Sequence, residues 1–339
     1  MIGTSNDGHI SGAPGAGGWE NMTATGSRVT RVAIARGPRP GTDRIEVRTQ
    51  DGLAGFGEGY WGERGLRRAP EILLGRSPFE AEAIYDELAA ADPDTPGGLD
   101  MALWDLMGKA LGTASAALLG KTFRARVVAC AAAGGAGPPD GYWMWRSEPE
   151  TAQAVEGGFD CGIRLTAATV DEALAMGAHL ETRPLAFWES PLAEDDVDGY
   201  RRLRHALAIP IAARGARGLD ALVRTLVQYR LVDVVVPEIA RFGLTGIRRL
   251  AYYCWLFRVR GAVECSGSAV STAAALAAAT LYVPVTNAIA APAPFVVMPV
   301  EAEAAAGLDA AGTLAVSAGP GLGIGEPPPL TAADVILGE

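Results

Sequence analysis

Short apolar runs that end in a polar or charged residue recur through the second half of the chain. Residues 185–192 read Leu-Ala-Phe-Trp-Glu-Ser-Pro-Leu, so Glu189 stands where Ser190 and Pro191 end the apolar run. The same pattern recurs at residues 209–214, 232–238 and 262–265. Such runs, roughly 25 residues apart, are typical of buried parallel strands, and in a barrel their carboxyl ends form the catalytic face. The pattern predicts one ring with Glu189 at its mouth.

The first part of the chain has a different periodicity. Apolar and polar residues alternate over residues 28–35 and 44–49, and a Gln-Asp-Gly turn at residues 50–52 leads to residues 53–58. Period-two alternation around a short polar turn is typical of hairpins. We therefore expect a three-stranded antiparallel meander.

Helical periodicity follows the meander from residue 67 to residue 119. Pro78 and Pro96 fall in the first turns of expected helices, and Gly120 follows the last periodic residue as a C-cap. Strands followed by helices predict an α+β accessory domain. Residues 1–27 are rich in Gly, Ser, Thr and Asn without periodicity, so we expect a flexible arm there.

Composition limits the class of protein. With 339 residues, 49% of them hydrophobic, the chain has room for a barrel and one smaller domain. The net charge of −10 argues against a nucleic-acid partner. The apolar segments of the chain are interrupted before they reach membrane-spanning length. We expect a cytoplasmic protein with no membrane partner. Its four cysteines, which show no CxxC spacing, should be reduced thiols.

Ordered motifs along the chain resemble one known family. Residues 99–120 contain Ala-Leu-Trp-Asp followed by Gly-Lys and Leu-Leu-Gly. This pattern resembles the helix that closes the capping domain in the mandelate racemase and muconate lactonizing enzyme branch of the enolase superfamily. Further segments that resemble this family are residues 51–58, 169–192, 209–213, 233–245 and 307–324.

The resemblance implies an α/β fold in which an α+β capping domain precedes a modified, shortened TIM-like (β/α) barrel. We place the capping domain at residues 28–125, with a C-terminal return at 307–339, and the barrel at 126–306. Residues 158–165 resemble the family's K-x-K strand, whereas the chain from Thr169 onward resembles the segment that comes after its D-x-N strand. We therefore expect that one strand–helix unit of ~30 residues is missing. We also expect a homo-oligomer, a dimer or larger.

The sequence departs from the family at the expected metal site. Family members hold Mg²⁺ with three carboxylates at consecutive strand ends, and the ion stabilises an enolate. Glu189 matches the middle ligand, but Arg214 and Gly215 stand where the third is expected, and no strand supplies the first. One carboxylate is a poor match for the octahedral oxygen coordination that Mg²⁺ prefers. We expect no bound metal and no other cofactor.

The family's catalytic bases are replaced as well. No lysine matches the K-x-K strand, where Arg164 is the nearest basic residue. At the seventh strand the chain reads Glu-Cys-Ser in place of a Pro-His-Ser motif, so Cys265 stands at the position of the histidine. Glu238 stands where the family has an Asp that often polarises this histidine or a lysine. The catalytic candidates are Glu189, Arg214, Arg164, Glu238, Glu264 and Cys265.

Each candidate has a structural alternative. A guanidinium of Arg214 where the cation stood could complement Glu189 or bind an anionic substrate in bidentate fashion, or it could simply repair the charge after loss of the metal. Glu189 could be a general acid or base, or a relic ion-pair partner. Glu238 and Glu264, facing the same mouth, could raise one pKa toward neutrality. Cys265 could be an ordinary buried residue, because no histidine is available to activate it.

Other residues are candidates for binding substrate. Trp61 and Arg64 follow the capping hairpin, where the family's mobile specificity loop lies. Aromatic residues after the first barrel strand could line a pocket for a planar substrate, or could pack under the capping domain. The complete set is Trp61, Arg64, Tyr142, Trp143, Trp145, Arg241 and Ser266.

Two classes of function remain. The first is a metal-independent lyase, dehydratase, cyclase or isomerase that acts on a small anionic or polar substrate. The second is a non-catalytic ligand-binding or scaffolding protein. Charged groups kept at several strand ends favour an enzyme, because a chain without catalysis should tend to lose them to apolar residues.

Overall fold

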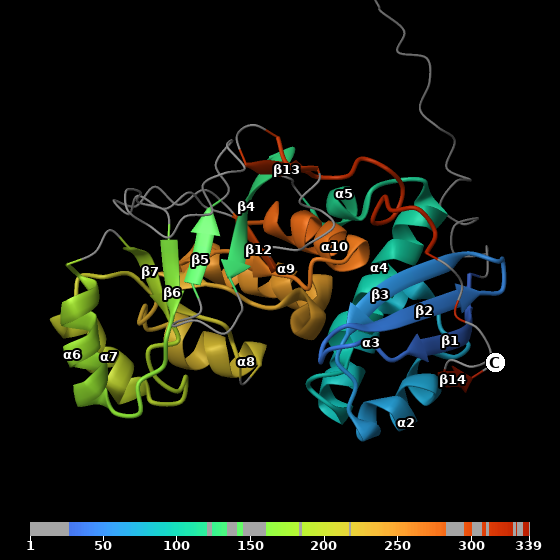
Figure 1. The fold of residues 1–339 in the computed structure, drawn as a ribbon. Helices are drawn as coiled ribbons and strands as arrows, with labels where there is room; N and C mark the ends of the chain where they lie inside the picture. The colour runs from blue at the N-terminus through green and yellow to red at the C-terminus, as the bar shows by residue number, and fades with distance from the viewer. Residues whose placement is uncertain are drawn as a thin grey trace, which may run out of the picture.

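The computed structural model describes residues 27–120, 124–133, 141–144, 161–182, 185–216, 218–282, 295–299, 307–309, 312–327, 330 and 335–338. Figure 1 shows a small antiparallel sheet with its helices at the right of the view and the strands of a barrel to its left. The predicted α/β fold, with a capping region and a TIM-like barrel, is confirmed.

The capping sheet has the order β14-β1-β2-β3, with antiparallel neighbours. Its strands are β1 (Val29–Ala35), β2 (Asp43–Thr49), β3 (Ala54–Gly59) and β14 (Val335–Gly338). The alternation in the sequence buries Val32, Ile34, Ile45 and Val47 in the core. The strand β14 comes from the opposite end of the sequence, so this sheet joins the two ends of the described chain.

Helical segments follow the capping strands. They are α2 (Glu63–Leu73), the 3₁₀ turn η1 (Pro78–Glu80), α3 (Ala81–Ala91), α4 (Pro96–Leu111) and α5 (Ser115–Leu119). Of these, α2 and α4 pack on the sheet. Ser77 begins η1 with a capping box, in which Glu80 accepts from the Ser77 backbone N–H. The helix α4 lies directly on β3, because a Cβ at Gly57 would come within 1.8 Å of the Gly98 carbonyl oxygen. Glycine at this position permits the close packing.

Asp105 of α4 explains the Asp and Lys of the capping-helix motif. Its buried carboxylate accepts from the Phe56 backbone N–H at 3.0 Å, the Lys109 ammonium at 2.7 Å and the Leu322 backbone N–H at 2.8 Å. Lys109 also donates to the carbonyl oxygen of Ala54 at 2.7 Å. One carboxylate therefore ties the hairpin, the helix and the C-terminal segment together.

The barrel strands form a closed ring. They are β4 (Arg126–Ala133), β5 (Gly141–Met144), β6 (Cys161–Arg164), β7 (Leu185–Glu189), β8 (Ile211–Ala213), β9 (Val234–Val235), β10 (Arg260–Gly261), β11 (Val263–Glu264) and β12 (Phe295–Pro299). The strands β4 to β10 pair in sequence order, β12 pairs with β4, and β11 pairs with β12. One residue separates β10, which pairs with β9, from β11, which pairs with β12, and this segment closes the ring.

One position of the ring is irregular. The strand β5 runs antiparallel to both β4 and β6, whereas the other neighbouring strands of the described ring are parallel. A further strand, β13 (Thr313–Ala315), pairs antiparallel with β4. An antiparallel strand thus stands between the first and the next parallel strand. The loss of one strand–helix unit and the domain boundaries stay predictions.

The barrel helices follow the strands. They are α6 (Val170–Leu180), α7 (Val197–Ala206), α8 (Leu219–Leu222) with the π-helical turn η2 (Val223–Val227), α9 (Ile239–Phe257) and α10 (Ala269–Ala279). Side-chain oxygens of Thr169, Asp196 and Ser268 cap α6, α7 and α10. A separate apolar cluster is formed by Cys130, Phe187, Ala212, Val234, Val236, Ala262 and Val297. Within the described residues, no helix is both long and apolar enough to cross a membrane.

Asp105→Ala should lower the free energy of unfolding by about 3–5 kcal/mol, because it removes the buried carboxylate that pairs with the partly buried Lys109 ammonium and accepts from two backbone N–H groups. Urea unfolding measures this change. The matched control is Glu63→Ala, which removes the acidic member of an exposed i,i+4 pair with Arg67. Its effect should be a small fraction of the Asp105 effect. Equal effects would show that the contacts of Asp105 contribute little stability.

Candidate functional site

Five charged side chains meet at one end of the barrel, and we call them the charged cluster. Each lies at the carboxyl end of a strand, and parallel strands bring these ends to the same side of the ring. The cluster consists of Arg164 at the end of β6, Glu189 at the end of β7, Arg214 after β8, Glu238 after β9 and Glu264 at the end of β11.

Glu189 is the most buried member of the charged cluster. Its side chain is 0% exposed, and Arg164 donates to it from Nε at 2.7 Å. The Nε atom of Arg214 lies 3.8 Å from the same carboxylate oxygen. A carboxylate taken out of water is stable only when it is paired and hydrogen-bonded. The two guanidiniums supply the positive charge that this carboxylate requires.

Glu264 lies between the same two guanidiniums. Its carboxylate accepts from Nη2 of Arg164 at 3.2 Å and forms an ion pair with Nη2 of Arg214 at 2.5 Å. A backbone bridge joins Glu264 to Glu238 on the neighbouring strand. The bridging carboxylate therefore occupies the position between the guanidiniums in which an anionic ligand group would fit.

Glu238 has a different environment, because its main partner comes from the capping region. The hydroxyl of Tyr60, just after β3, lies 2.9 Å from each oxygen of Glu238. Arg214 is more distant, with Nη2 at 3.7 Å from Oε2. Burial and the neighbouring charge of Glu264 raise the pKa of Glu238. Burial and the Glu238 charge raise the pKa of Tyr60 to about 12, so Tyr60 remains a hydrogen-bond donor at neutral pH.

The charge balance of the cluster singles out Glu238. Three carboxylates face two guanidiniums, so the fully ionised cluster has one excess negative charge. Glu189 is fully buried against guanidinium groups, and Glu264 bridges two of them. Glu238 has a weaker cationic partner, and its pKa is raised. It is therefore the group best suited to bind and release a proton.

A second contact joins the capping region to the barrel mouth. Ser266 donates its hydroxyl to the buried carboxylate of Glu58 in β3, and burial raises the pKa of Glu58. Ser266 was predicted to bind substrate, and here it binds this carboxylate. Neither Glu58 nor Tyr60 was among the predicted site residues. The sequence feature that could have indicated them is their position, with Glu58 in the capping hairpin and Tyr60 directly after it.

Cys265 lies in an apolar environment that suits a buried thiol. Its sulfur lies 3.8 Å from the hydroxyl of Thr272, and burial raises the pKa of the thiol to about 12. The thiol is therefore protonated at neutral pH, whereas the nucleophilic form of cysteine is the thiolate. The environment favours the packing alternative over the catalytic one.

The remaining binding candidates differ in where they lie. Trp61 is buried in the hydrophobic core, which suits packing more than ligand contact, and Arg64 is exposed at the start of α2. Arg241 donates to the Ala216 carbonyl oxygen at 3.1 Å and pairs with Asp94 at 2.8 Å. Its guanidinium also lies over the ring of Tyr60 at 5.3 Å, so it borders the charged cluster.

Two of the aromatic candidates, Tyr142 and Trp143, lie on β5, of which the backbone alone is described. Trp145 lies outside the described residues. The roles of all three stay predictions.

The residues at the mouth do not fit the divalent metal that the family resemblance implies. Mg²⁺ requires a near-octahedral set of oxygen ligands. Here the one matching carboxylate, Glu189, pairs with Arg164, and the Nε atom of Arg214 lies 3.8 Å from the same carboxylate. In the part of the chain that the structure describes, no group of three or more His, Cys, Asp or Glu side chains is arranged to hold a metal. A guanidinium this close would repel a divalent cation.

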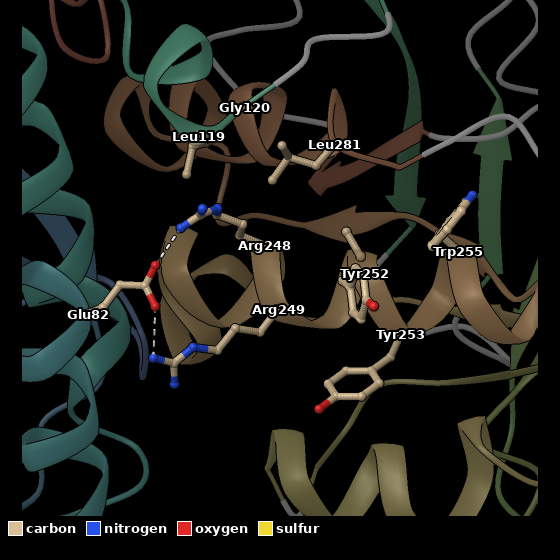
Figure 2. Close-up of a pocket in the computed structure, with 10 residues that line it drawn as sticks. Glu82, Leu119, Gly120, Arg248, Arg249, Tyr252, Tyr253, Trp255 and Leu281 are labelled. Atoms are coloured by element: carbon tan, nitrogen blue, oxygen red, sulfur yellow. Dashed lines mark hydrogen bonds and ion pairs between the residues drawn. The ribbon is translucent and has the colours of Figure 1, made fainter.

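A cavity of about 770 Å³ lies elsewhere, on the surface where α3 of the capping region faces α9. Figure 2 shows Glu82 paired with Arg248 and Arg249, and aromatic side chains of α9 along the cavity. Its lining consists of Glu82, Leu119, Gly120, Arg248, Arg249, Ala251, Tyr252, Tyr253, Trp255 and Leu281. None of these belongs to the charged cluster, and the one carboxylate of the lining, Glu82, is already paired. The charged cluster is therefore the stronger candidate site.

Comparison with known proteins identifies the family. A family model described as enolase C-terminal domain-like matches residues 149–325, which is more than half of the chain. The chain belongs to the enolase superfamily. The predicted resemblance to its mandelate racemase and muconate lactonizing enzyme branch is thereby confirmed.

Relatives of this superfamily member include enzymes that act on sugar acids and their lactones. It shares 25% identity over 279 residues with D-galactarolactone cycloisomerase of Agrobacterium fabrum, covering 68% of this chain and 73% of that protein. It also shares 25% identity over 305 residues with D-galactonate dehydratase of Ralstonia pickettii, covering 74% of this chain and 78% of that protein.

A solved structure supports the same fold. The 3,6-anhydro-D-galactonate cycloisomerase of Zobellia galactanivorans superposes with a TM-score of 0.67 at 18% identity. The superposition covers 88% of this chain and 96% of that one. At this identity the match establishes the fold alone.

The raised pKa of Glu238 predicts how stability depends on pH. A carboxyl that holds its proton more tightly in the folded state stabilises the fold below its unfolded pKa, near 4.5. That contribution is lost as the pH rises through the folded pKa. The difference in unfolding free energy, Glu238→Gln minus wild type, should therefore increase as the pH rises above 4.5. Urea unfolding at a series of pH values measures it, with exposed Glu63→Gln as the control. A difference that shrinks with rising pH would contradict the assignment.

Proposed function

We propose that the chain is an enzyme that catalyses a dehydration or cycloisomerisation of a small sugar acid or sugar lactone without a divalent metal. The sugar-acid relatives support this class of reaction and substrate. The observation that carries the proposal is the charged cluster, in which Arg164 and Arg214 border the carboxylate that matches a metal ligand of the family.

The two guanidiniums would take over the electrostatic role of the ion. Removal of a proton next to a carboxylate places negative charge on the carboxylate oxygens, and preorganised cations stabilise that charge in a site shielded from water. One unit charge at 4 Å contributes about 4 kcal/mol at an effective dielectric constant of 20. The planar guanidiniums of Arg164 and Arg214 also suit bidentate binding of a carboxylate.

The carboxyl groups would divide the remaining tasks. Glu189 keeps both guanidiniums in place, because it is fully buried and paired. Glu264 lies where the carboxylate of the substrate would bind, so we expect the substrate to displace it from Arg164 and Arg214. Glu238, with its raised pKa, is our candidate for the group that exchanges a proton with the substrate, and Tyr60 orients it.

The alternative is a non-catalytic ligand-binding protein. One observation favours it: both guanidiniums already pair with carboxylates of the chain itself. A protein that binds a ligand without turning it over would need no proton carrier. The two functions differ in whether a bound sugar acid is converted.

Turnover of D-galactonate, D-gluconate and D-galactarolactone should proceed equally well with Mg²⁺ and with EDTA. The reason is that, in this proposal, the guanidiniums supply the positive charge that a metal would otherwise supply. Product formation measured by chromatography tests this, with thermal shift as a parallel assay for binding. Turnover that requires Mg²⁺ would overturn the metal-independent proposal. Binding without turnover would favour the non-catalytic alternative.

Arg214→Ala should lower turnover, or ligand binding, by about 100-fold or more while the fold remains intact, because it removes a cation from the place where charge develops. The control is Arg224→Ala, an exposed arginine that pairs with Asp220 on the outside of the barrel. Circular dichroism verifies the fold of both variants. Equal loss in the two variants would contradict the role of Arg214.

A further inference from the structure

The turn that carries Arg214 is bound by a carboxylate that the proposed function does not use. Glu194 lies between β7 and α7 and is 9% exposed. It accepts hydrogen bonds from three consecutive backbone N–H groups. Oε1 accepts from Arg214 at 2.7 Å and from Gly215 at 2.9 Å, and Oε2 accepts from Ala216 at 2.7 Å. One side chain therefore satisfies every backbone donor at the start of this turn.

Three successive N–H groups that point to one anion form a concave anion-binding site, and charge-assisted hydrogen bonds of this length are strong. The turn requires Gly215, which has φ of +79°. A Cβ at Gly215 would also lie 2.7 Å from the ring of Phe242. The conformation that directs the three donors to Glu194 therefore requires a glycine at position 215.

Arg214 is the first residue of this turn, so the position of its backbone sets the direction of its side chain. Its guanidinium reaches Glu264 at 2.5 Å and approaches Glu189 and Glu238 at 3.8 and 3.7 Å. A displacement of the backbone by about 1 Å is enough to cost a site up to roughly 100-fold in rate. On its other side, the turn receives a hydrogen bond from Arg241 to the Ala216 carbonyl oxygen at 3.1 Å.

We propose that Glu194 is a positioning residue, which sets the place of the Arg214 guanidinium through the backbone of residues 214–216 without contacting the ligand. This inference rests on the proposed function only in assuming that Arg214 binds the ligand. It gives a role to the buried carboxylate of Glu194, which lies directly behind the turn. It also means that the position of Arg214, after β8, depends on Glu194 in the preceding connection between β7 and α7.

A matched control lies at the other end of the same strand. Glu181 accepts from the backbone N–H groups of Ala208 and of Ile209, the latter at 3.1 Å, before β8 begins. Glu194→Gln and Glu181→Gln each weaken a carboxylate–backbone contact next to β8. The first lies at the mouth of the barrel and the second at the opposite end.

The first experiment measures kcat and KM for D-galactonate. Glu194→Gln should lower kcat/KM by about ten-fold or more, whereas Glu181→Gln should leave it within about two-fold. In an Arg214→Ala background, Glu194→Gln should have no further effect, and Glu194→Asp should restore part of the loss. Equal losses in the Glu194 and Glu181 variants would overturn the positioning role.

The second experiment needs no ligand. In urea unfolding, the effects of Glu194→Gln and Arg214→Ala should be non-additive, while those of Glu181→Gln and Arg214→Ala should add. Additive effects of the Glu194 and Arg214 changes would overturn the inference. Non-additive effects without any binding of D-galactonate would support the inference and contradict the proposed substrate class. If Glu194→Gln does not fold, Glu194→Asp enters the same cycle with the same expectation.

Discussion

The ion pair between Arg164 and the fully buried carboxylate of Glu189 is the interaction on which the candidate site depends. An unpaired carboxylate in this position would cost several kcal/mol, so the strand that carries Glu189 requires a cation from a neighbouring strand. Arg164 on β6 provides it at 2.7 Å, and Arg214 after β8 approaches the same oxygen. In the proposed function, these two guanidiniums supply the positive charge that the family resemblance assigns to an ion.

This constraint links the barrel to the capping region. Glu264 bridges the two guanidiniums, so Glu238 has only a more distant cation, and its close partner is the hydroxyl of Tyr60, which follows β3 of the capping sheet. Ser266 and Glu58 form a second contact of the same kind. The capping region therefore completes the polar environment of the mouth, and it does so from the strand on which α4 packs so closely.

The sequence predicted the fold well because its information was local or carried by ordered motifs. Period-two alternation indicated the meander, and apolar runs ending in charges indicated the strand ends that carry Glu189 and Arg214. Contacts between distant segments left little signal: nothing local marks the antiparallel pairing of β5, the return of β14, or Tyr60 as the partner of Glu238. Glu194 could not be found from the sequence, because its hydrogen-bond donors are backbone N–H groups, which are present at every non-proline residue.

The claim that guanidiniums stand in for the metal is tested most directly by crystals soaked in Mn²⁺, with anomalous scattering used to locate the ion. Our account predicts no anomalous peak within about 2.5 Å of the Glu189 carboxylate, and clear density for the Arg164 and Arg214 guanidiniums beside it. A Mn²⁺ peak coordinated by Glu189, with the two guanidiniums turned away from the carboxylate, would contradict it.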